Sequence, residues 1–462
     1  MNTPSHRHRG ISLLFVAILQ PVLIGLAGLA IDTCYVYFTY QRLQVTADAA
    51  ALAAATQLPA SINPRSGTPI PPHGFVYSYA EQVALPNFPV VIPNGSTTAV
   101  VALRPNDANA DDANNDYDVV IGRYLARTAS SQATFTASQV IGGSLVVPPY
   151  PNAVKIVARR DTRSSAGPLP LFFGPLFGIT TVNMKRQAIA VINLPPTVVV
   201  LGGPNSPPNA DQSLTISSGA VLSAPGGPVQ VNSLAIDAVN IVAGGGIRAT
   251  ALNIVGGITG DTSRTNTSGT MISLGVKASG DPLASLSGPS VPANNLSYSS
   301  GQPTVAPGHY PAGIALGSGS LFMQPGVYYL DGAGLRITGS ASLTALGVMI
   351  YVHTGQLTLN STGTILMTPN QSGNATPSSG LVSGLVIFQD RLNFQAATIS
   401  GPGTLEINGA LYLPAAALTV TGQGDTFGSE LIANTLTITG NVSLNPDGPI
   451  PVAQTPTTYL GQ

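Results

Sequence analysis

Short hydrophobic triplets recur at nearly even intervals through residues 196–462. Each triplet has the form Leu-x-Ile, Leu-x-Val or Leu-x-Leu, and most are followed by a small polar residue. Successive triplets are separated by steps of 20, 18, 22 and 18 residues. This period is typical of a parallel β-helix, in which each inward side chain stacks on its equivalent in the next turn. The triplets begin at positions 214, 234, 252, 335, 357, 418 and 436.

The charge content of the same region agrees with a stacked core. Residues 196–462 hold five basic and ten acidic side chains, and only 8% of the whole chain is charged, against about 25% in an average soluble domain. We therefore predict a repeat-built domain over 196–462, most simply a right-handed parallel β-helix. A β-sandwich is the alternative, because it also consists of short strands separated by turns. Residues 255–310 interrupt the period and are expected to form an excursion or belt over one face.

The N-terminal region contains an uncharged stretch, Ile11 to Ile31. A helix of this length spans roughly 30 Å, the thickness of the hydrocarbon core of a bilayer. Basic residues precede it and Asp32 follows it, so the positive-inside rule places 1–10 in the cytoplasm and the rest outside. We predict a retained transmembrane anchor. The alternative is a signal peptide cleaved near 28–30, although the core of such a signal is usually only about 7–15 residues long.

Residues 32–58 contain neither Gly nor Pro and continue the helical pattern beyond the predicted span. Apolar positions in this segment follow a spacing of four and three residues, which places them on one stripe of a helix. Two partners for the stripe remain open: the next domain of this chain, or a helix of another protein. The stripe consists of Val36, Tyr40, Leu43, Ala47, Ala50 and Ala54.

Residues 59–195 predict a small α+β domain. A Pro-rich linker opens it, a short helix is expected over 75–85, and an uncharged apolar element occupies 170–178. Alternating apolar and polar residues predict a mostly antiparallel sheet. The expected strands are 98–103, 117–121, 133–136, 153–158 and 182–192.

The composition excludes several kinds of chemistry. A net charge of −1 leaves no basic excess for nucleic acid, and one Cys and five scattered His give no metal-ligand spacing. Enzymes built on β-helices need acids gathered at one groove, but the acids of residues 196–462 are spread singly. Only Asp331 with Arg336 and Asp390 with Arg391 are close neighbours in sequence. We therefore predict a protein without catalytic residues or cofactors.

One segment has the composition of a calcium loop. Asp107, Asn109, Asp111 and Asp118 match positions 1, 3, 5 and 12 of such a loop. Asp112 stands where the turn requires Gly, however, and Asp118 replaces the usual Glu. A hairpin loop rich in Asp and Asn is the simpler alternative.

The N-terminal motifs resemble those of a known family. Gly10 to Phe15, Leu26 to Asp32 and Arg42 to Ala55 together resemble the TadG-like Tad (Flp) pilus-assembly proteins. The order of elements in the middle segment extends this resemblance to about residue 194. Related pilin-like members carry Glu five residues after the prepilin cleavage site. Phe15 occupies that position here, which argues against this cleavage.

The resemblance implies a single-pass protein of the bacterial inner membrane, which is a structural component of a Tad pilus or a related envelope apparatus. The membrane, pilin-like or other Tad proteins, and further copies of the chain are the expected partners. The first alternative is an independent surface adhesin or stalk that shares only the anchor. A β-helix enzyme acting on polysaccharides is the second alternative.

Overall fold

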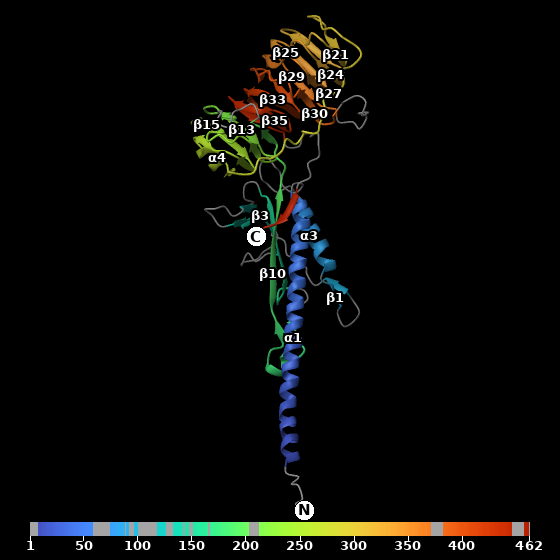
Figure 1. The fold of residues 1–462 in the computed structure, drawn as a ribbon, viewed down its shortest axis with the longest axis vertical. Helices are drawn as coiled ribbons and strands as arrows, with labels where there is room; N and C mark the ends of the chain where they lie inside the picture. Colours follow the sequence, from blue (N-terminus) through green and yellow to red (C-terminus); the bar gives the residue numbers. More distant parts are fainter. Residues whose placement is uncertain are drawn as a thin grey trace, which may run out of the picture. The chain divides into compact units, whose positions relative to one another are not determined.

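The chain forms two compact units, and a computed structural model describes most of both (Figure 1). The first unit contains Met1–Asn193 together with Thr457–Gln462, and the second contains Leu194–Pro456. Thr457–Gln462 thus belong to the first unit, whereas the sequence predicts that the repeat domain extends over 196–462. The described residues are 8–58, 74–87, 89–91, 97–99, 118–125, 133–141, 144–146, 151–164, 167–202, 212–370, 382–445 and 457–461.

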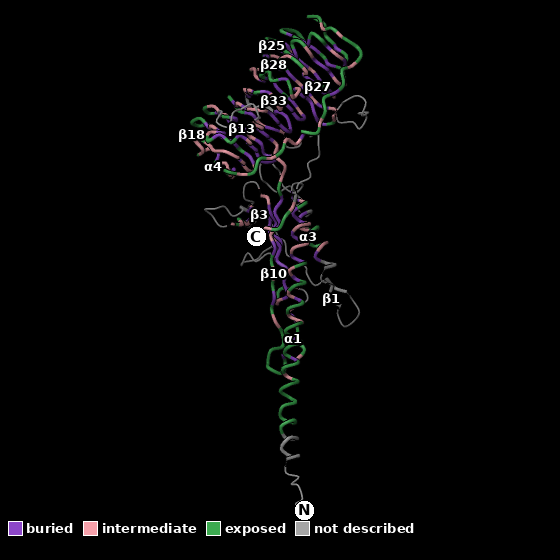
Figure 2. Tube along the Cα trace, in the orientation of Figure 1, coloured by how far each residue is buried: buried purple, intermediate pink, exposed green. Residues whose placement is uncertain are grey.

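A single long helix, α1 (His8–Thr56), opens the chain. It joins the predicted span and the predicted amphipathic segment without a break and contains Pro21 in its interior. Its N-terminal part is exposed, whereas from Asp32 onward one side is buried (Figure 2). Within the described part of the chain, α1 is the one helix long and apolar enough to cross a membrane.

The first unit packs α1 and α3 (Gly74–Asn87) with a five-stranded sheet of order β37-β10-β7-β3-β4. Every pairing in this sheet is antiparallel, which confirms the predicted small α+β domain. The strands are β3 (Val119–Leu125), β4 (Thr134–Ala137), β7 (Ala153–Arg160), β10 (Met184–Asn193) and β37 (Thr457–Leu460).

Three small hairpins and a turn of 3-10 helix complete the first unit. The hairpin of β8 and β9 carries at its tip the turn η1, which falls in the apolar element noted in the sequence. These elements are β1 (Pro89–Val91), β2 (Thr97–Ala99), β5 (Gln139–Ile141), β6 (Ser144–Val146), β8 (Leu169–Pro170), η1 (Gly174–Phe177) and β9 (Thr181–Val182).

The second unit is a parallel β-solenoid of about ten turns, as the period predicts. Its strands pair only in parallel with equivalent strands of neighbouring turns, which excludes the β-sandwich. The strands of the first face are β11 (Val198–Val200), β14 (Val229–Val231), β17 (Ala251–Ile254), β19 (Met271–Leu274), β21 (Gly308–Tyr310), β24 (Gly326–Leu330), β27 (Val348–Val352) and β30 (Leu385–Gln389). Two longer strands, β33 (Ala410–Val420) and β35 (Leu431–Ile438), run through both the first and the second face.

The other two faces are built in the same way. The second face contains β12 (Leu214–Ile216), β15 (Val239–Ile241), β18 (Ile258–Gly260), β22 (Ile314–Leu316), β25 (Gly334–Gly339), β28 (Gln356–Ser361) and β31 (Ala397–Ser400). The third contains β13 (Val221–Ala224), β16 (Gly246–Ala249), β20 (Thr304–Val305), β23 (Ser320–Met323), β26 (Ser342–Leu346), β29 (Ile365–Thr368), β32 (Leu405–Ile407), β34 (Gln423–Thr426) and β36 (Asn441–Ser443). A short helix, α4 (Ser263–Thr267), lies between β18 and β19.

The solenoid begins in the middle of its own stack. Its first strand, β11, pairs with β14 on one side and with β35, one of its last strands, on the other. The chain therefore winds outward from β11 to β19, crosses through residues 275–303, and winds back from β21 to β35. The predicted excursion over 255–310 is therefore correct only for residues 275–303, which connect the two halves of the stack, because 258–260, 271–274, 304–305 and 308–310 form paired strands of the solenoid.

The stacking register follows the predicted triplets in part. Leu335 pairs with Leu357 and Leu418 pairs with Leu436, as the steps of 22 and 18 residues require. Leu234 is exposed and lies in a loop, and Leu214 is paired with Val239 instead. The reason is that Val239-Asn-Ile241 has the same inward, outward, inward pattern, with both apolar residues buried.

Glycine is required at one stacked corner of the solenoid. Gly334 and Gly355 both have positive φ, and a Cβ on Gly334 would lie 2.3 Å from the carbonyl oxygen of Gln356. Only a residue without a side chain permits this approach of successive turns.

Candidate functional site

The carboxylate of Asp32 joins the end of the predicted membrane span to a loop far away in the sequence. Asp32 is buried, and its oxygens accept the backbone N–H groups of Phe172 at 2.8 Å, Phe173 at 2.9 Å and Gly174 at 2.7 Å. These three residues belong to the stretch Leu171–Ile179, which we call the apolar loop. A carboxylate that accepts several backbone N–H groups makes strong, charge-assisted hydrogen bonds.

Two glycines of α1 allow the apolar loop to lie against the helix. A Cβ on Gly28, one turn before Asp32, would be only 2.5 Å from the ring of Phe173. A Cβ on Gly25, almost one turn earlier, would lie at an ordinary contact distance of 3.6 Å from the ring of Phe177. The sequence analysis noted both the Gly-Leu-Ala-Ile-Asp motif and the apolar element, but no local spacing indicates that the two meet.

The predicted helical stripe packs on this chain. Leu43, Ala47, Ala50 and Ala54 are fully buried within the first unit, where α1 lies against β10, β7 and α3. Of the two partners that the sequence left open, the structure therefore favours the chain's own domain. The small Ala side chains allow this close packing.

Tyr40 of the stripe and Gln44, which lies between stripe residues, make cation–π and hydrogen-bond contacts with β10. The Arg186 guanidinium lies 3.4 Å from the ring centroid of Tyr40, a cation–π contact. Gln44 Nε2 donates to Asp48 Oδ1 at 2.7 Å and to the carbonyl oxygen of Gln187 at 3.5 Å. Val36 is half-buried.

A different face of α1 remains exposed beyond the predicted span. Tyr37, Phe38 and Val45 are exposed, and Arg42 lies over the Phe38 ring at 5.7 Å. This face, rather than the predicted stripe, is open to a partner in the described structure.

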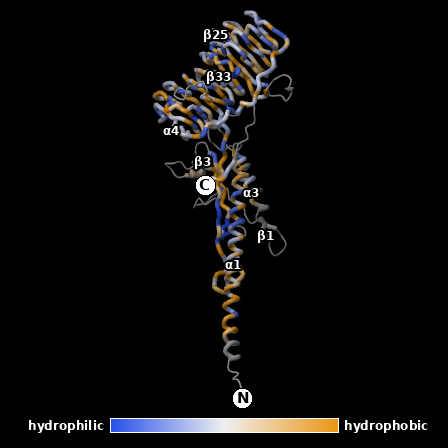
Figure 3. The backbone as a smooth tube through the Cα atoms, viewed as in Figure 1, coloured by the Kyte–Doolittle hydropathy of each residue, from blue (hydrophilic) through white to orange (hydrophobic). Residues whose placement is uncertain are grey.

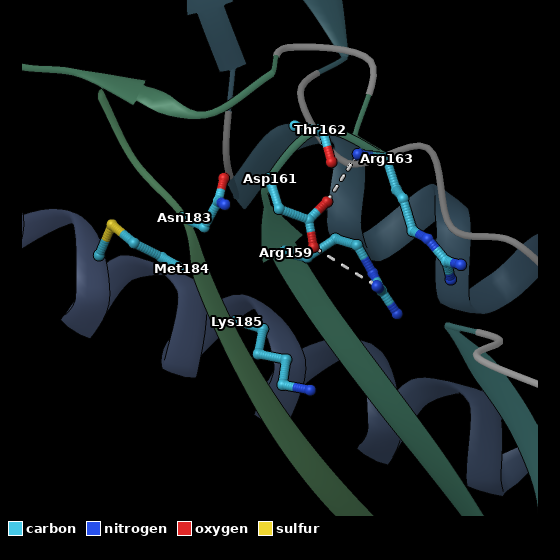
Figure 4. Close-up of a pocket in the computed structure, with 7 residues that line it drawn as sticks. All are labelled: Arg159, Asp161, Thr162, Arg163, Asn183, Met184 and Lys185. Carbon is cyan, nitrogen blue, oxygen red and sulfur yellow. Dashed lines mark hydrogen bonds and ion pairs between the residues drawn. The ribbon is translucent and has the colours of Figure 1, made fainter. Parts of the chain in front are cut away.

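A basic pocket of about 350 Å³ lies at the ends of β7 and β10 (Figure 4). Arg163 and Lys185 line it together with Arg159 and Asp161. Arg159 is buried and bonds Asp118 at 2.5 Å and Asp161 at 3.5 Å, so it serves the fold as well as the pocket. Thr162, Asn183 and Met184 complete the lining.

The calcium-loop prediction falls almost entirely outside the described residues. Asp107, Asn109 and Asp111 are not described, and Asp118 is buried in its ion pair with Arg159. Within the described ranges, the structure contains no group of three His, Cys, Asp or Glu residues placed to hold a metal ion.

On the solenoid, stacked aromatic side chains follow the outer side of the first face. Tyr329, Tyr351, Phe388 and Tyr412 form a ladder with ring centroids 5.0, 4.9 and 5.0 Å apart. Leu283, from the connection between β19 and β20, packs into the same buried cluster. The successive rings are tilted or edge-to-face to one another, and aromatic pairs in such orientations at this separation stabilise neighbouring turns.

Arg391 fastens the connection to this ladder. Its guanidinium donates to the carbonyl oxygens of Leu286 at 2.5 Å and Leu283 at 2.6 Å, and to the hydroxyl of Tyr412 at 2.7 Å. The Tyr412 hydroxyl in turn donates to Asp281 at 2.6 Å. Burial raises the pKa of Tyr412, and its hydrogen bond to Asp281 adds to this effect.

Glu430 lies close to the same network. It is buried, and burial together with the nearby charge of Asp281 raises the pKa of Glu430 to about 7. Two acids therefore gather here, although their sequence positions are far apart. Glu430 and Tyr412 are buried, so the arrangement supports packing of the connection rather than access for a substrate.

Asp331 and Asp390, which lie close to Arg336 and Arg391 in the sequence, form hydrogen bonds with other residues. Asp331 bonds His309 at 2.8 Å, His353 at 2.7 Å and Thr354 at 3.0 Å. Partial burial raises the pKa of Asp331, but the hydrogen bonds from these three residues outweigh it and hold the pKa below its usual value. Asp390 accepts a hydrogen bond from the hydroxyl of Tyr351.

Comparison with known proteins bears on the first unit. Residues 10–57 match the family model of Flp pilus-assembly TadE/G-like proteins, and residues 80–190 match that of Tad-like Flp pilus-assembly proteins. No curated protein and no solved structure matches the chain. Together the matches cover α1, most of α3 and the sheet up to β10, and they confirm the resemblance to Tad-type Flp pilus-assembly proteins inferred from the motifs.

Proposed function

We propose that this chain is a membrane-anchored, non-catalytic structural component of a Tad-type pilus, held in the bacterial inner membrane with residues 1–10 in the cytoplasm. One observation carries the proposal. The family match over 10–57 coincides with α1, whose first part is exposed and apolar and whose second part packs on the domain that follows it in this chain. Such a helix is suited to fix a folded domain at the outer surface of the membrane.

The exposed face of α1 supports a partner helix in the same apparatus. Tyr37, Phe38 and Val45 present apolar surface just beyond the span, where the buried stripe is already occupied. Exposed aromatic and aliphatic residues grouped on one face are typical of interaction sites. The partner is a helix of another Tad protein in this proposal.

Extraction and protease access test the anchor and its orientation. We expect the full chain to stay in the membrane pellet after alkaline carbonate, and the solenoid to be cut by protease added to spheroplasts. Release by carbonate, or protection of the solenoid until the membrane is opened, contradicts the proposed anchor or its orientation.

Photo-crosslinking tests the partner. A photoreactive residue at Val45 is expected to capture a Tad pilus-assembly protein identified by mass spectrometry, whereas the same residue at exposed Lys277 of the solenoid is the matched control. A protein that is membrane-bound but captures no Tad component from Val45 is better explained as an independent adhesin. Turnover of an acidic polysaccharide by the purified chain contradicts the non-catalytic part.

A further inference from the structure

The apolar loop presents large hydrophobic side chains to its surroundings. Phe172, Leu176, Phe177 and Ile179 are exposed by 67%, 73%, 59% and 55%. Apart from two Gly and one Pro, the loop consists only of Leu, Phe and Ile. Water is a poor solvent for such a concentrated apolar surface.

Seven of the eight N–H groups of the loop donate hydrogen bonds within the protein. Besides the three N–H groups bonded to Asp32, the N–H groups of Leu171, Leu176, Gly178 and Ile179 donate to carbonyl oxygens within 169–180. Pro175 has no N–H to satisfy. A loop in water can leave these groups to solvent, whereas a backbone in lipid must bond them within the protein.

The loop also lies beside the predicted membrane span (Figure 1, green, next to α1). The ring of Phe172 is 5.1 Å from that of Tyr35, and the ring of Phe177 lies against Gly25. Gly25 precedes Ile31 by six residues, which is about 9 Å along the helix. The apolar colouring of α1 continues onto the loop (Figure 3).

Charged residues mark the two ends of this hairpin. Between Arg163 and Lys185 the chain has no charged residue, and both cations line the same pocket at the base of the hairpin. Cations that flank an apolar segment commonly lie at the level of the lipid head groups. Lys185 is next to Arg186, which contacts Tyr40, nine residues beyond Ile31.

We propose that the apolar loop is a second membrane-contacting element, which enters the acyl chains of the leaflet where the α1 span ends and is positioned there by Asp32. The inference rests on the proposed membrane anchor. The occupant of its exposed surface is lipid, because the loop lies beside Gly25 within the span, whose own apolar side chains are exposed. The first unit would then sit at a fixed depth and tilt relative to the bilayer.

Tryptophan fluorescence tests this directly, because the chain contains no Trp. Three full-length variants are reconstituted in phosphatidylcholine–phosphatidylglycerol vesicles that carry nitroxides on the acyl chains. Phe177→Trp reports the loop, Phe15→Trp reports the span, and Phe394→Trp reports an exposed site on the solenoid. Each of the three replaced Phe side chains is more than half exposed, so the larger Trp ring has room at all three positions.

We expect Phe177→Trp to show a blue shift of its emission and a loss of intensity comparable to that of Phe15→Trp, while Phe394→Trp keeps its intensity. Quenching of Phe15→Trp without quenching of Phe177→Trp overturns the inference and leaves the anchor intact. It would indicate that the loop is instead covered by protein in the cell. If Phe15→Trp is not quenched, the anchor itself fails.

A double variant tests the role of Asp32. In Asp32→Ala combined with Phe177→Trp, we expect the emission to shift to longer wavelength and the nitroxide quenching to decrease, because the loop loses three bonds to α1. The same quenching with and without Asp32 contradicts its positioning role. Quenching of Phe15→Trp in the same background checks that the span remains inserted.

Discussion

Asp32 accepts the backbone N–H of Gly174 at 2.7 Å, although 142 residues separate the two in sequence. This bond and its two neighbours connect the end of the apolar part of α1 to the tip of a hairpin that precedes β10. The carboxylate thus orders a segment that has little other polar contact with the helix.

Removal of this carboxylate is expected to destabilise the first unit. Asp32→Ala leaves three backbone donors without their acceptor, a loss of about 3 kcal/mol in the free energy of unfolding. Faster proteolysis of the hairpin in detergent micelles would measure it. Thr33→Ala is the matched control, because Thr33 is exposed and bonds only the carbonyl oxygen of Leu29 in its own helix. Equal proteolysis of both variants contradicts the role assigned to Asp32.

The two glycines of α1 are expected to respond differently to the same substitution. Gly28→Ala places a methyl group 2.5 Å from the Phe173 ring and should cost about 1–3 kcal/mol of unfolding free energy. In Gly25→Ala the new methyl group lies 3.6 Å from the Phe177 ring, which is an ordinary contact distance. This substitution should leave the unfolding free energy unchanged or raise it by up to about 1 kcal/mol. Thermal unfolding of the two variants in micelles makes the comparison. Similar melting temperatures would show that the loop does not press on Gly28.

Glu430 should make the solenoid less stable as the pH rises. Its pKa is about 7 in the folded chain and 4.5 ordinarily, so the fold binds its proton more tightly than the unfolded chain does. The unfolding free energy should be highest below pH 4.5, fall as the pH rises through 7, and then level off, a total loss of up to about 3 kcal/mol. Glu430→Gln should remove this part of the pH dependence. Glu406→Gln, at an exposed position, should leave it unchanged.

Arg391 should control the connection between the two halves of the solenoid. Arg391→Ala removes three bonds and frees residues 281–286, at a cost of about 3 kcal/mol. Hydrogen exchange of Leu283 and Leu286 is expected to accelerate while that of β27 is unchanged. Arg336→Ala, an exposed position on β25, is the control. Unaltered exchange in Arg391→Ala would mean that apolar packing alone holds the connection.

The sequence predicted the helices and strands better than it predicted the tertiary contacts between them. The uncharged run and the helical spacing after it predicted α1, and the triplets predicted a solenoid, because both signals are local and periodic. The choice between Leu234 and Val239 as the partner of Leu214 was not predictable, because both triplets have the same pattern.

The site was less accessible to sequence reasoning. The contact of Asp32 with Phe172–Gly174 depends on how the sheet places a distant hairpin, and no spacing encodes that. The stripe from Val36 to Ala54 was recognised as a packing face, but its period carries no information on which surface covers it. The gathering of Asp281, Tyr412 and Arg391 likewise follows only from the crossing of residues 275–303.

The return of β37 to β10 has a consequence for the order of assembly. Asn193 pairs with Thr457, so the outgoing and returning chain ends are neighbours, and everything between them is inserted into the sheet. During synthesis, the edge of β10 at Ala190–Asn193 stays unpaired until β37 has been made. An open strand edge of this kind readily pairs with another chain, so a product truncated before β37 would expose a strand edge, prone to aggregation, that β37 otherwise covers.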